Sequence, residues 1–255
     1  MSKHDLTLEP PLMNAAGSLG FAPDLHSPLD WSRLGAFVTN PISLLPRTPA
    51  RGQRFATYPG GFLLHTGYPN PGLARSIQRF ARQWSGASIP VIVHLLARGV
   101  DEVVKMTRHL EQVDGVTGLE LSLPVDATGE LVKAFVEAAG GELPLIVRLP
   151  VERSLELAAG AIQAGASAIS LGPPRGAFPS PDGELVQGRM YGPALLPLSL
   201  RVVQVLSRQG IPTIGSGGVY KQEHIDAMLG AGALAVQLDS IFWKEAGYNP
   251  ITQRS

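Results

Sequence analysis

The segment Ile211-Pro-Thr-Ile-Gly-Ser-Gly-Gly218 is a short apolar run that ends in glycines and leads into a helical stretch, Lys221 to Leu229. After that stretch, Ala233-Leu-Ala-Val-Gln-Leu-Asp-Ser-Ile241 is a second apolar run that ends in a polar turn. The two turns are expected to present backbone N–H groups to one anion, because peptide N–H groups and helix N-termini favour negative charge. The alternative is that Gly217 and Gly218 only form a tight turn.

Similar apolar runs recur along the whole chain, and polar segments with helical periodicity separate them. Apolar strands that alternate with helices are typical of parallel strands buried on both faces, and eight of them predict a single-domain (β/α)8 barrel over residues 1–255. In such a barrel the loops after the seventh and eighth strands form a phosphate site, which is where the glycine-rich turn falls. The expected strands are Leu12–Gly17, Ala36–Ile42, Ile89–Leu96, Gly118–Pro124, Leu143–Pro150, Ala168–Gly172, Ile211–Gly215 and Ala235–Ile241.

Three stretches stand outside this alternation. Pro46–Asn70 and Pro173–Gly192 are rich in Gly, Pro and Arg, and we expect them to be long irregular loops with a functional role. Only Phe242–Ser255 follows the last strand, and its Gly and Pro prevent a long helix. The sequence therefore predicts a reduced C-terminal cap, and we expect a homo-oligomer in which a partner subunit covers the thin seam.

Composition excludes several classes of function. The 21 basic and 21 acidic residues cancel and form no charged block, which argues against nucleic acid or an anionic membrane as partner. With no cysteine, the chain has no disulfide, no thiolate metal site and no cysteine nucleophile. The six histidines are scattered without a metal-binding spacing, so no metal is expected. No signal sequence or membrane-spanning run is visible, and we expect a cytoplasmic protein.

Seven short motifs extend through nearly the whole chain. Their order and spacing resemble the dihydroorotate dehydrogenase family. That resemblance implies a (β/α)8 barrel that holds FMN at its C-terminal mouth, where a small-molecule substrate, dihydroorotate, gives hydride to the flavin. The motifs are Leu12-Met-Asn-Ala-Ala-Gly17, Val38-Thr-Asn-Pro41, His65-Thr-Gly-Tyr-Pro-Asn-Pro-Gly72, Leu119-Glu-Leu-Ser-Leu-Pro124, Ile146-Val-Arg-Leu-Pro150, Tyr191-Gly-Pro-Ala194 and Ile211–Gly218.

The resemblance assigns cofactor-binding roles to backbone-exposing residues. Ala15, Ala16 and Gly17 are small residues at the end of the first strand, where a flat ring can approach the main chain, although close helix packing would also select them. Asp239 falls where the family has a small residue beside the phosphate. The positions that match the family around the FMN phosphate are Gly192, Gly217, Gly218 and Ser240.

The side chains that perform the family's chemistry differ here. Leu123 stands where the family has its Cys or Ser general base, and leucine cannot accept a proton, so the resemblance is to a divergent member that lacks the base. Asn40 and Arg148 stand where the family has two lysines that contact the flavin. The family's substrate-binding asparagines correspond to Leu64, Glu120, Val125 and Gly172.

Other residues with suitable proton chemistry remain. His65 lies in a loop that the family folds over the active site, His94 ends the third strand, and Glu120 lies in the fourth. The alternative for His65 is that it is an ordinary loop histidine, and the alternative for His94 is that it only hydrogen-bonds its neighbours. Ser122 is next to Leu123, but the alternation of strand side chains turns it to the opposite face, which makes it a poor replacement for the base.

Glu120 and Arg148 occupy matched positions on consecutive strands. Side chains alternate along a strand, so both are expected to point into the barrel mouth while Leu119 and Leu121 face the helices. Neighbouring strands lie about 4.8 Å apart, which brings the two charges together. The pair either serves catalysis, with Arg148 offering positive charge to the flavin and Glu120 holding it or acting as the base, or is a structural plug.

The sequence leaves three hypotheses for function. The leading one is an FMN-dependent oxidoreductase with altered or reduced activity, because the base and substrate-binding residues are replaced. The second is a non-catalytic barrel that binds flavin or phosphate and acts with a partner chain. The third is an enzyme of phosphorylated metabolites without flavin, since the glycine-rich turn recognises phosphate alone.

Overall fold

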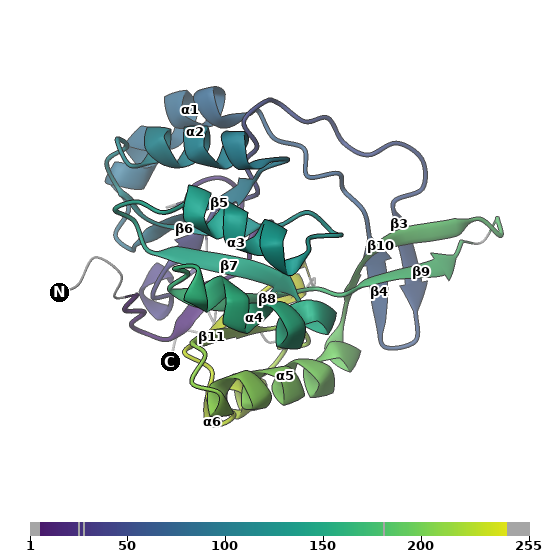
Figure 1. Ribbon diagram of the computed structural model, residues 1–255. Coiled ribbons are helices and arrows are strands. Elements are labelled where there is room, and N and C mark those ends of the chain that lie inside the picture. The colour runs from purple at the N-terminus through teal and green to yellow at the C-terminus, as the bar shows by residue number, and fades with distance from the viewer. Residues whose placement is uncertain (1–5, 25, 28, 181, 244–255) are drawn as a thin grey trace.

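The computed structural model describes residues 6–24, 26–27, 29–180 and 182–243. Eight parallel strands form the central barrel in the order β1-β12-β11-β8-β7-β6-β5-β2, which confirms the predicted (β/α)8 architecture (Figure 1). The strands are β1 (Leu12–Asn14), β2 (Phe37–Val38), β5 (Val91–Leu96), β6 (Val116–Ser122), β7 (Leu145–Pro150), β8 (Ala168–Gly172), β11 (Thr213–Ser216) and β12 (Ala235–Leu238).

The barrel closes between its shortest strands, β1 and β2. Met13 and Ala36 form an isolated parallel bridge there, and the Gly35 N–H donates to Leu12 O at 2.8 Å. The Asn14 side chain reinforces this seam, because its amide donates to Val38 O at 2.7 Å and accepts from Val38 N at 2.8 Å. A side chain thus supplies the interstrand hydrogen bonds that a two-residue strand cannot.

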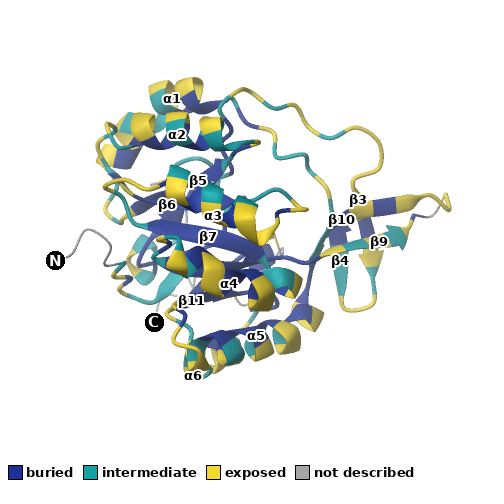
Figure 2. Cartoon of the chain, viewed as in Figure 1, coloured by how far each residue is buried: buried dark blue, intermediate teal, exposed yellow. Residues whose placement is uncertain are grey.

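Helices cover the outside of the barrel, with their outer faces exposed and the strands beneath them buried (Figure 2). Between β1 and β2 the described residues contain only a short 3-10 turn, η1 (Trp31–Arg33). No helix in the described ranges is long and apolar enough to cross a membrane. The helices are α1 (Leu73–Ser85), α2 (Val100–Leu110), α3 (Gly129–Ala138), α4 (Ser154–Gln163), α5 (Leu196–Arg208) and α6 (Gln222–Gly230), and the other 3-10 turns are η2 (Val151–Arg153), η3 (Pro193–Leu195) and η4 (Ser240–Trp243).

The two stretches predicted as irregular loops instead contribute to a second sheet, so that prediction was wrong. Four antiparallel strands in the order β3-β4-β10-β9 project from the barrel (Figure 1). In register, Tyr191 pairs with Phe62, so backbone hydrogen bonds are satisfied between segments far apart in sequence, whereas Leu185 pairs with Pro179 in a local hairpin. The strands are β3 (Phe55–Tyr58), β4 (Gly61–Leu64), β9 (Arg175–Pro179) and β10 (Leu185–Tyr191).

The apolar core has two parts, one between the barrel and its helices and one inside the barrel. The inner part fills the lower layers of the barrel, and the inward-facing residues above it are polar or charged. Residues 244–255 lie outside the described residues, so the predicted reduced cap stays a prediction. The inner core consists of Leu8, Met13, Ala36, Val38, Ile92, Ile146, Ala168, Ile214 and Ala235.

Candidate active site at the barrel mouth

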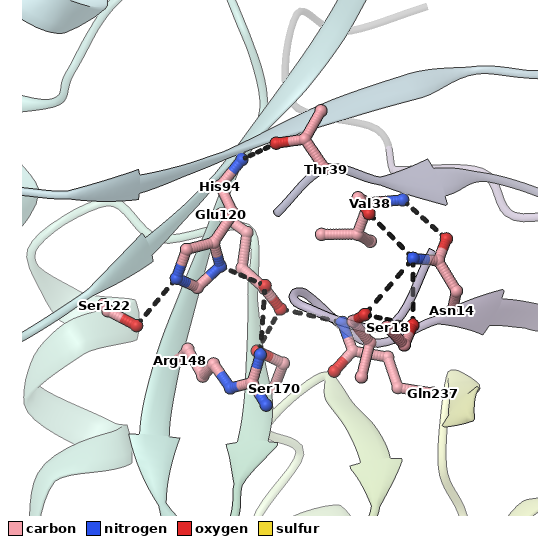
Figure 3. Close-up of polar contacts among 11 residues, drawn as sticks. Asn14, Ser18, Val38, Thr39, His94, Glu120, Ser122, Arg148, Ser170 and Gln237 are labelled. Carbon is pink, nitrogen blue, oxygen red and sulfur yellow. Dashed lines mark hydrogen bonds and ion pairs between the residues drawn. The ribbon is translucent and has the colours of Figure 1, made fainter. Parts of the chain in front are cut away.

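A buried polar cluster surrounds Glu120 above the inner core (Figure 3). Its Oε1 accepts hydrogen bonds from Ser170 Oγ at 2.6 Å and from Gln237 Nε2 at 2.7 Å. Its Oε2 lies 2.6 Å from His94 Nδ1 and 3.8 Å from a guanidinium nitrogen of Arg148. Both carboxylate oxygens are therefore held by neighbours on four other strands, β5, β7, β8 and β12, and this carboxylate is the centre of the mouth.

Strand alternation brings the cluster together. In the parallel ladders His94 pairs with Glu120, so these two side chains lie at one level. Arg148 pairs with Ser122 on one side and with Ser170 on the other, so it lies one inward-facing position above Glu120 and the two charges meet diagonally. Leu119 and Leu121 pack against the helices on the other face. The predicted inward orientation and ion pair of Glu120 and Arg148 are confirmed, but the predicted matched register is wrong, because Glu120 pairs with Ile146 on β7.

Ser122 points into the barrel like Glu120, although the sequence analysis rejected it as a base because strand alternation turns it away from Leu123. It lies two residues after Glu120 on β6, and its Oγ is 2.8 Å from His94 Nε2. The orientation of Ser122 cannot be judged from Leu123, because β6 ends at Ser122 and Leu123 lies outside the strand. Alternation along β6 places Ser122 on the same face as Glu120, two residues earlier. Leu123 and Ser122 both line a cavity at the mouth.

The surroundings fix the charges of the cluster. Burial opposes ionisation of Glu120, but the hydrogen bond and charge of His94, the charge of Arg148 and the hydrogen bond from Ser170 outweigh burial and lower the pKa of Glu120 to about 2. Burial lowers the pKa of His94, against the opposing hydrogen bond and charge of Glu120. At neutral pH the site therefore holds an ionised carboxylate beside a neutral imidazole.

Stability should fall as the pH falls, and both groups act in the same direction. Glu120 ionises at pH about 2 when folded and at about 4.5 when unfolded, so its contribution, on the order of 3 kcal/mol, is complete above pH 4.5 and lost towards pH 2. His94 binds its proton more readily when unfolded, so stability also falls below pH about 6.5. Urea unfolding between pH 7 and 3 measures this, and Glu120→Gln should flatten the acid part of the curve. An unchanged acid part in this variant would contradict the assignment.

One cavity at the mouth is rich in positive charge, and we call it the arginine pocket after Arg148, Arg175 and Arg189, which line it with Ser122. Burial and then the charge of Arg189 lower the pKa of Arg175, as expected for crowded cations. The Arg189 guanidinium is also 4.2 Å from the centre of the Tyr68 ring. Such a pocket favours a carboxylate or another small anion. Its remaining lining residues are Tyr68, Leu123, Val125, Pro150, Gly172 and Pro173.

A second cavity adjoins the first through Tyr68, and we call it the apolar pocket. Ala16, Gly17 and Asn40 line it, as the cofactor prediction requires. Gly17 has φ of +94°, and a Cβ there would come no closer than 4.0 Å to Pro41 Cδ, so the backbone faces open space. These residues fit the ring of a flavin. The rest of the lining is Pro41, Leu64, Thr66, Tyr68, Pro69, Tyr191 and Trp243.

The remaining residues predicted to bind the flavin ring or the substrate lie in different surroundings. Ala15 is buried, and its N–H joins β1 to β12 by donating to Leu238 O at 2.7 Å. Asn40 Oδ1 accepts the Gly20 N–H at 3.2 Å. His65 has an exposed side chain at the end of β4 and does not join the contacts described for the Glu120 cluster.

The predicted phosphate end contains an acidic residue. The buried carboxylate of Asp239 accepts from the backbone N–H of Ser240, and Ser240 Oγ also contacts the Tyr220 hydroxyl at 2.6 Å. A Cβ on Gly218 would lie 2.4 Å from Leu196 N, and one on Gly192 would lie 2.3 Å from a backbone oxygen. Packing alone therefore requires these glycines. The lining of the apolar pocket fits the ring of FMN. At the predicted phosphate position, however, the negative charge of Asp239 lies beside Ser240, the residue that would donate to the phosphate, and it opposes an anion there.

Comparison with known proteins decides which family contains this arrangement. The model of the family described as dihydroorotate dehydrogenase matches residues 2–139, more than half of the chain. The chain belongs to the dihydroorotate dehydrogenase family. It is similar to the protein named dihydroorotate dehydrogenase B (NAD(+)), catalytic subunit, from three bacteria. Identity is 30% with that of Geotalea uraniireducens over 93% of this chain and 87% of the relative. It is 30% with Pelobacter propionicus and 31% with Trichlorobacter lovleyi, over 91% of this chain and 84% of each relative.

Membership of the dihydroorotate dehydrogenase family confirms the resemblance seen in the seven sequence motifs. Leu123 occupies the expected base position of this dihydroorotate dehydrogenase-like chain and lines the arginine pocket next to Ser122. Ser170 and Gln237 were missed by sequence reasoning. Their signal was a polar residue within an apolar strand run, at a position with inward parity.

Proposed function

We propose that this protein is an FMN-dependent oxidoreductase for a small anionic substrate, with altered or reduced activity on dihydroorotate. The observation that carries the proposal is the pair of adjoining cavities that share Tyr68, one apolar and one lined by three arginines. Family membership supports FMN as the cofactor. A flavin in the apolar pocket would lie directly beside an anion in the arginine pocket, which is the arrangement that hydride transfer requires.

Different residues of the chain would then bind the cofactor and the substrate. Bound FMN supplies a two-electron acceptor for hydride. Ala16, Gly17 and Asn40 line the pocket for its ring, and Arg175 with Arg189 would hold the anionic group of the substrate. Arg148 would keep positive charge at the inner end of the pocket, where Glu120 fixes it.

Altered specificity follows from the replaced side chains. Leu64 and Gly172 line the two cavities at positions where the family has asparagines that bind substrate. An apolar or absent side chain cannot satisfy the hydrogen bonds of the dihydroorotate ring, and unsatisfied buried polar groups weaken binding. The cations of the arginine pocket remain, so affinity for an anion is retained while recognition of this ring is lost.

The proposal is tested by mixing FMN-loaded protein anaerobically with dihydroorotate and with a panel of small carboxylate-bearing hydride donors. We expect at least one of the panel to bleach the flavin about tenfold faster than dihydroorotate, which corresponds to about 1.4 kcal/mol. If dihydroorotate is the fastest donor, the altered specificity is wrong. If no donor bleaches the flavin, the non-catalytic alternative replaces the proposal.

That alternative, a flavin- or phosphate-binding barrel that acts with a partner chain, is favoured by the leucine at position 123.

An aromatic surface lies beside the apolar pocket, because Trp243 is 41% exposed and packs on Tyr191 with 5.2 Å between the ring centres. We propose that a second copy of the chain covers it. Light scattering at micromolar concentration should give a dimer or larger, and a monomer mass would contradict the homo-oligomer.

A further inference from the structure

Three residues of the polar cluster form an ordered chain of hydrogen bonds, of which the proposed function uses only Glu120, as the partner of Arg148. Ser122 Oγ is 2.8 Å from Nε2 of His94, and Nδ1 on the opposite side of that ring is 2.6 Å from the Glu120 carboxylate. Each ring nitrogen of His94 thus has one partner, a hydroxyl on one side and a carboxylate on the other. This is the arrangement of a serine whose proton a histidine can accept while an acid orients the ring.

The direction of the hydrogen bonds follows from the carboxylate. An ionised Glu120 only accepts, so the Nδ1 of His94 carries the proton that joins them. In a neutral imidazole Nε2 is then the acceptor, and the hydroxyl hydrogen of Ser122 points at it. Ser170 and Gln237 hold the other carboxylate oxygen, which fixes the acid in place.

Access is confined to one end of the chain. Ser122 lines the arginine pocket, whereas His94 and Glu120 are 1% and 0% exposed. A substrate in that pocket therefore meets the serine hydroxyl and not the histidine. The charged groups that act on His94 are Glu120, which favours its protonation, and Arg148 and Arg189, which oppose it. The ring is poised to accept a proton briefly and return it.

We propose that Ser122 exchanges a proton with the substrate, with His94 as the base behind it and Glu120 as a positioning residue. The inference rests on the proposed function and supplies the proton step that Leu123 cannot. As the substrate C–H bond next to a carbonyl breaks, its proton goes to Ser122 Oγ, and the serine's own proton goes to His94 Nε2. The hydride leaves from the neighbouring carbon to the bound flavin, the oxidant, and a carbon–carbon double bond forms. His94 then returns its proton to Ser122 Oγ, and the serine releases the substrate-derived proton to water in the arginine pocket.

Ser122→Cys provides a test that needs no substrate, because the sequence contains no cysteine and the introduced thiol is the single one in the chain. Alkylation by iodoacetamide follows the thiolate, which forms with a pKa of about 8.5 for an ordinary thiol and about 3.5–7.5 beside an accepting histidine. We expect the midpoint of the rate against pH to lie at least about one unit below that of Val125→Cys. Val125 lines the same pocket and is 51% exposed, so it is the matched control.

His94→Gln in the Ser122→Cys background should return the midpoint to the ordinary range. If that double variant does not fold, the comparison with Val125→Cys alone decides. Equal midpoints for the two thiols would overturn the relay.

A second experiment separates the relay from the proposed function. In FMN-loaded protein, Ser122→Ala should retain flavin but reduce the rate of flavin reduction by the best donor at least about 100-fold, the usual scale of general base catalysis. If flavin reduction in Ser122→Ala is as fast as in the parent protein, the relay is wrong, but the proposed oxidoreductase function is retained. A lowered thiol midpoint in a protein that takes up no FMN supports the activated serine and removes the proposed function.

Discussion

Glu120→Gln is expected to lower the free energy of unfolding by about 3–5 kcal/mol, the cost typical of removing one member of a buried ion pair. The reason is that Arg148, 7% exposed, loses the negative charge that compensates its burial, and His94, 1% exposed, loses the ionised acceptor of its Nδ1 hydrogen. The amide also presents hydrogen-bond donors where Ser170 and Gln237 donate to Oε1. Urea denaturation of the purified variant at pH 7 measures the change.

A surface ion pair provides the matched control. Glu156 accepts from Arg153 at 2.7 Å, but its side chain is 61% exposed, and Glu156→Gln should leave the free energy of unfolding nearly unchanged because solvent screens the pair. The double variant Glu120→Gln/Arg148→Gln should be less destabilised than the sum of its two single variants, because no uncompensated charge remains. Equal effects of Glu120→Gln and Glu156→Gln would mean that the buried cluster does not stabilise the barrel.

Asp239→Gly is expected to raise the affinity for FMN by about tenfold or more. The buried carboxylate of Asp239 accepts from the backbone N–H of Ser240, at the position where the family resemblance puts the phosphate. Two like charges about 4 Å apart repel by about 1 kcal/mol in water and about 4 kcal/mol at an effective dielectric of 20, and about 1.4 kcal/mol is tenfold in affinity. Titration of the apoprotein with FMN, followed by flavin fluorescence, gives the constant.

Asp239→Asn separates charge from shape, because the amide oxygen still accepts from Ser240 while the negative charge is removed. It should recover most of the gain seen with glycine. If FMN affinity is unchanged or lower in both variants, the carboxylate does not face the phosphate and the assignment of Ser240 to the cofactor is wrong.

The sequence alone predicted the barrel because its strands are buried on both faces. Such strands are continuous apolar runs, and their order along the chain is their order in the barrel. The Glu120–Arg148 pair was also predictable, since strand parity and the adjacency of β6 and β7 follow from the same pattern. The roles of the site residues are harder to predict from the sequence, because they depend on which side chains meet across several strands.

The antiparallel sheet could not be predicted in this way. Its central pairing joins β4 to β10, more than 120 residues apart, and Gly61 and Gly188 interrupt the apolar alternation that identifies a strand. These positions need glycine, because a Cβ on Gly61 or Gly188 would come within 2.8 Å of the neighbouring backbone. Close packing of the two segments thus removes the very pattern by which they would be recognised.

The FMN content of the purified protein tests the central claim most directly. Protein expressed with flavin present, or incubated with FMN and freed of excess, is denatured, and the released cofactor is identified by mass spectrometry and quantified against the chain. The account predicts one FMN for each chain and a yellow protein, with the Asp239→Gly variant retaining it more tightly. A colourless protein that takes up no FMN, in both the parent and the Asp239→Gly forms, would contradict it.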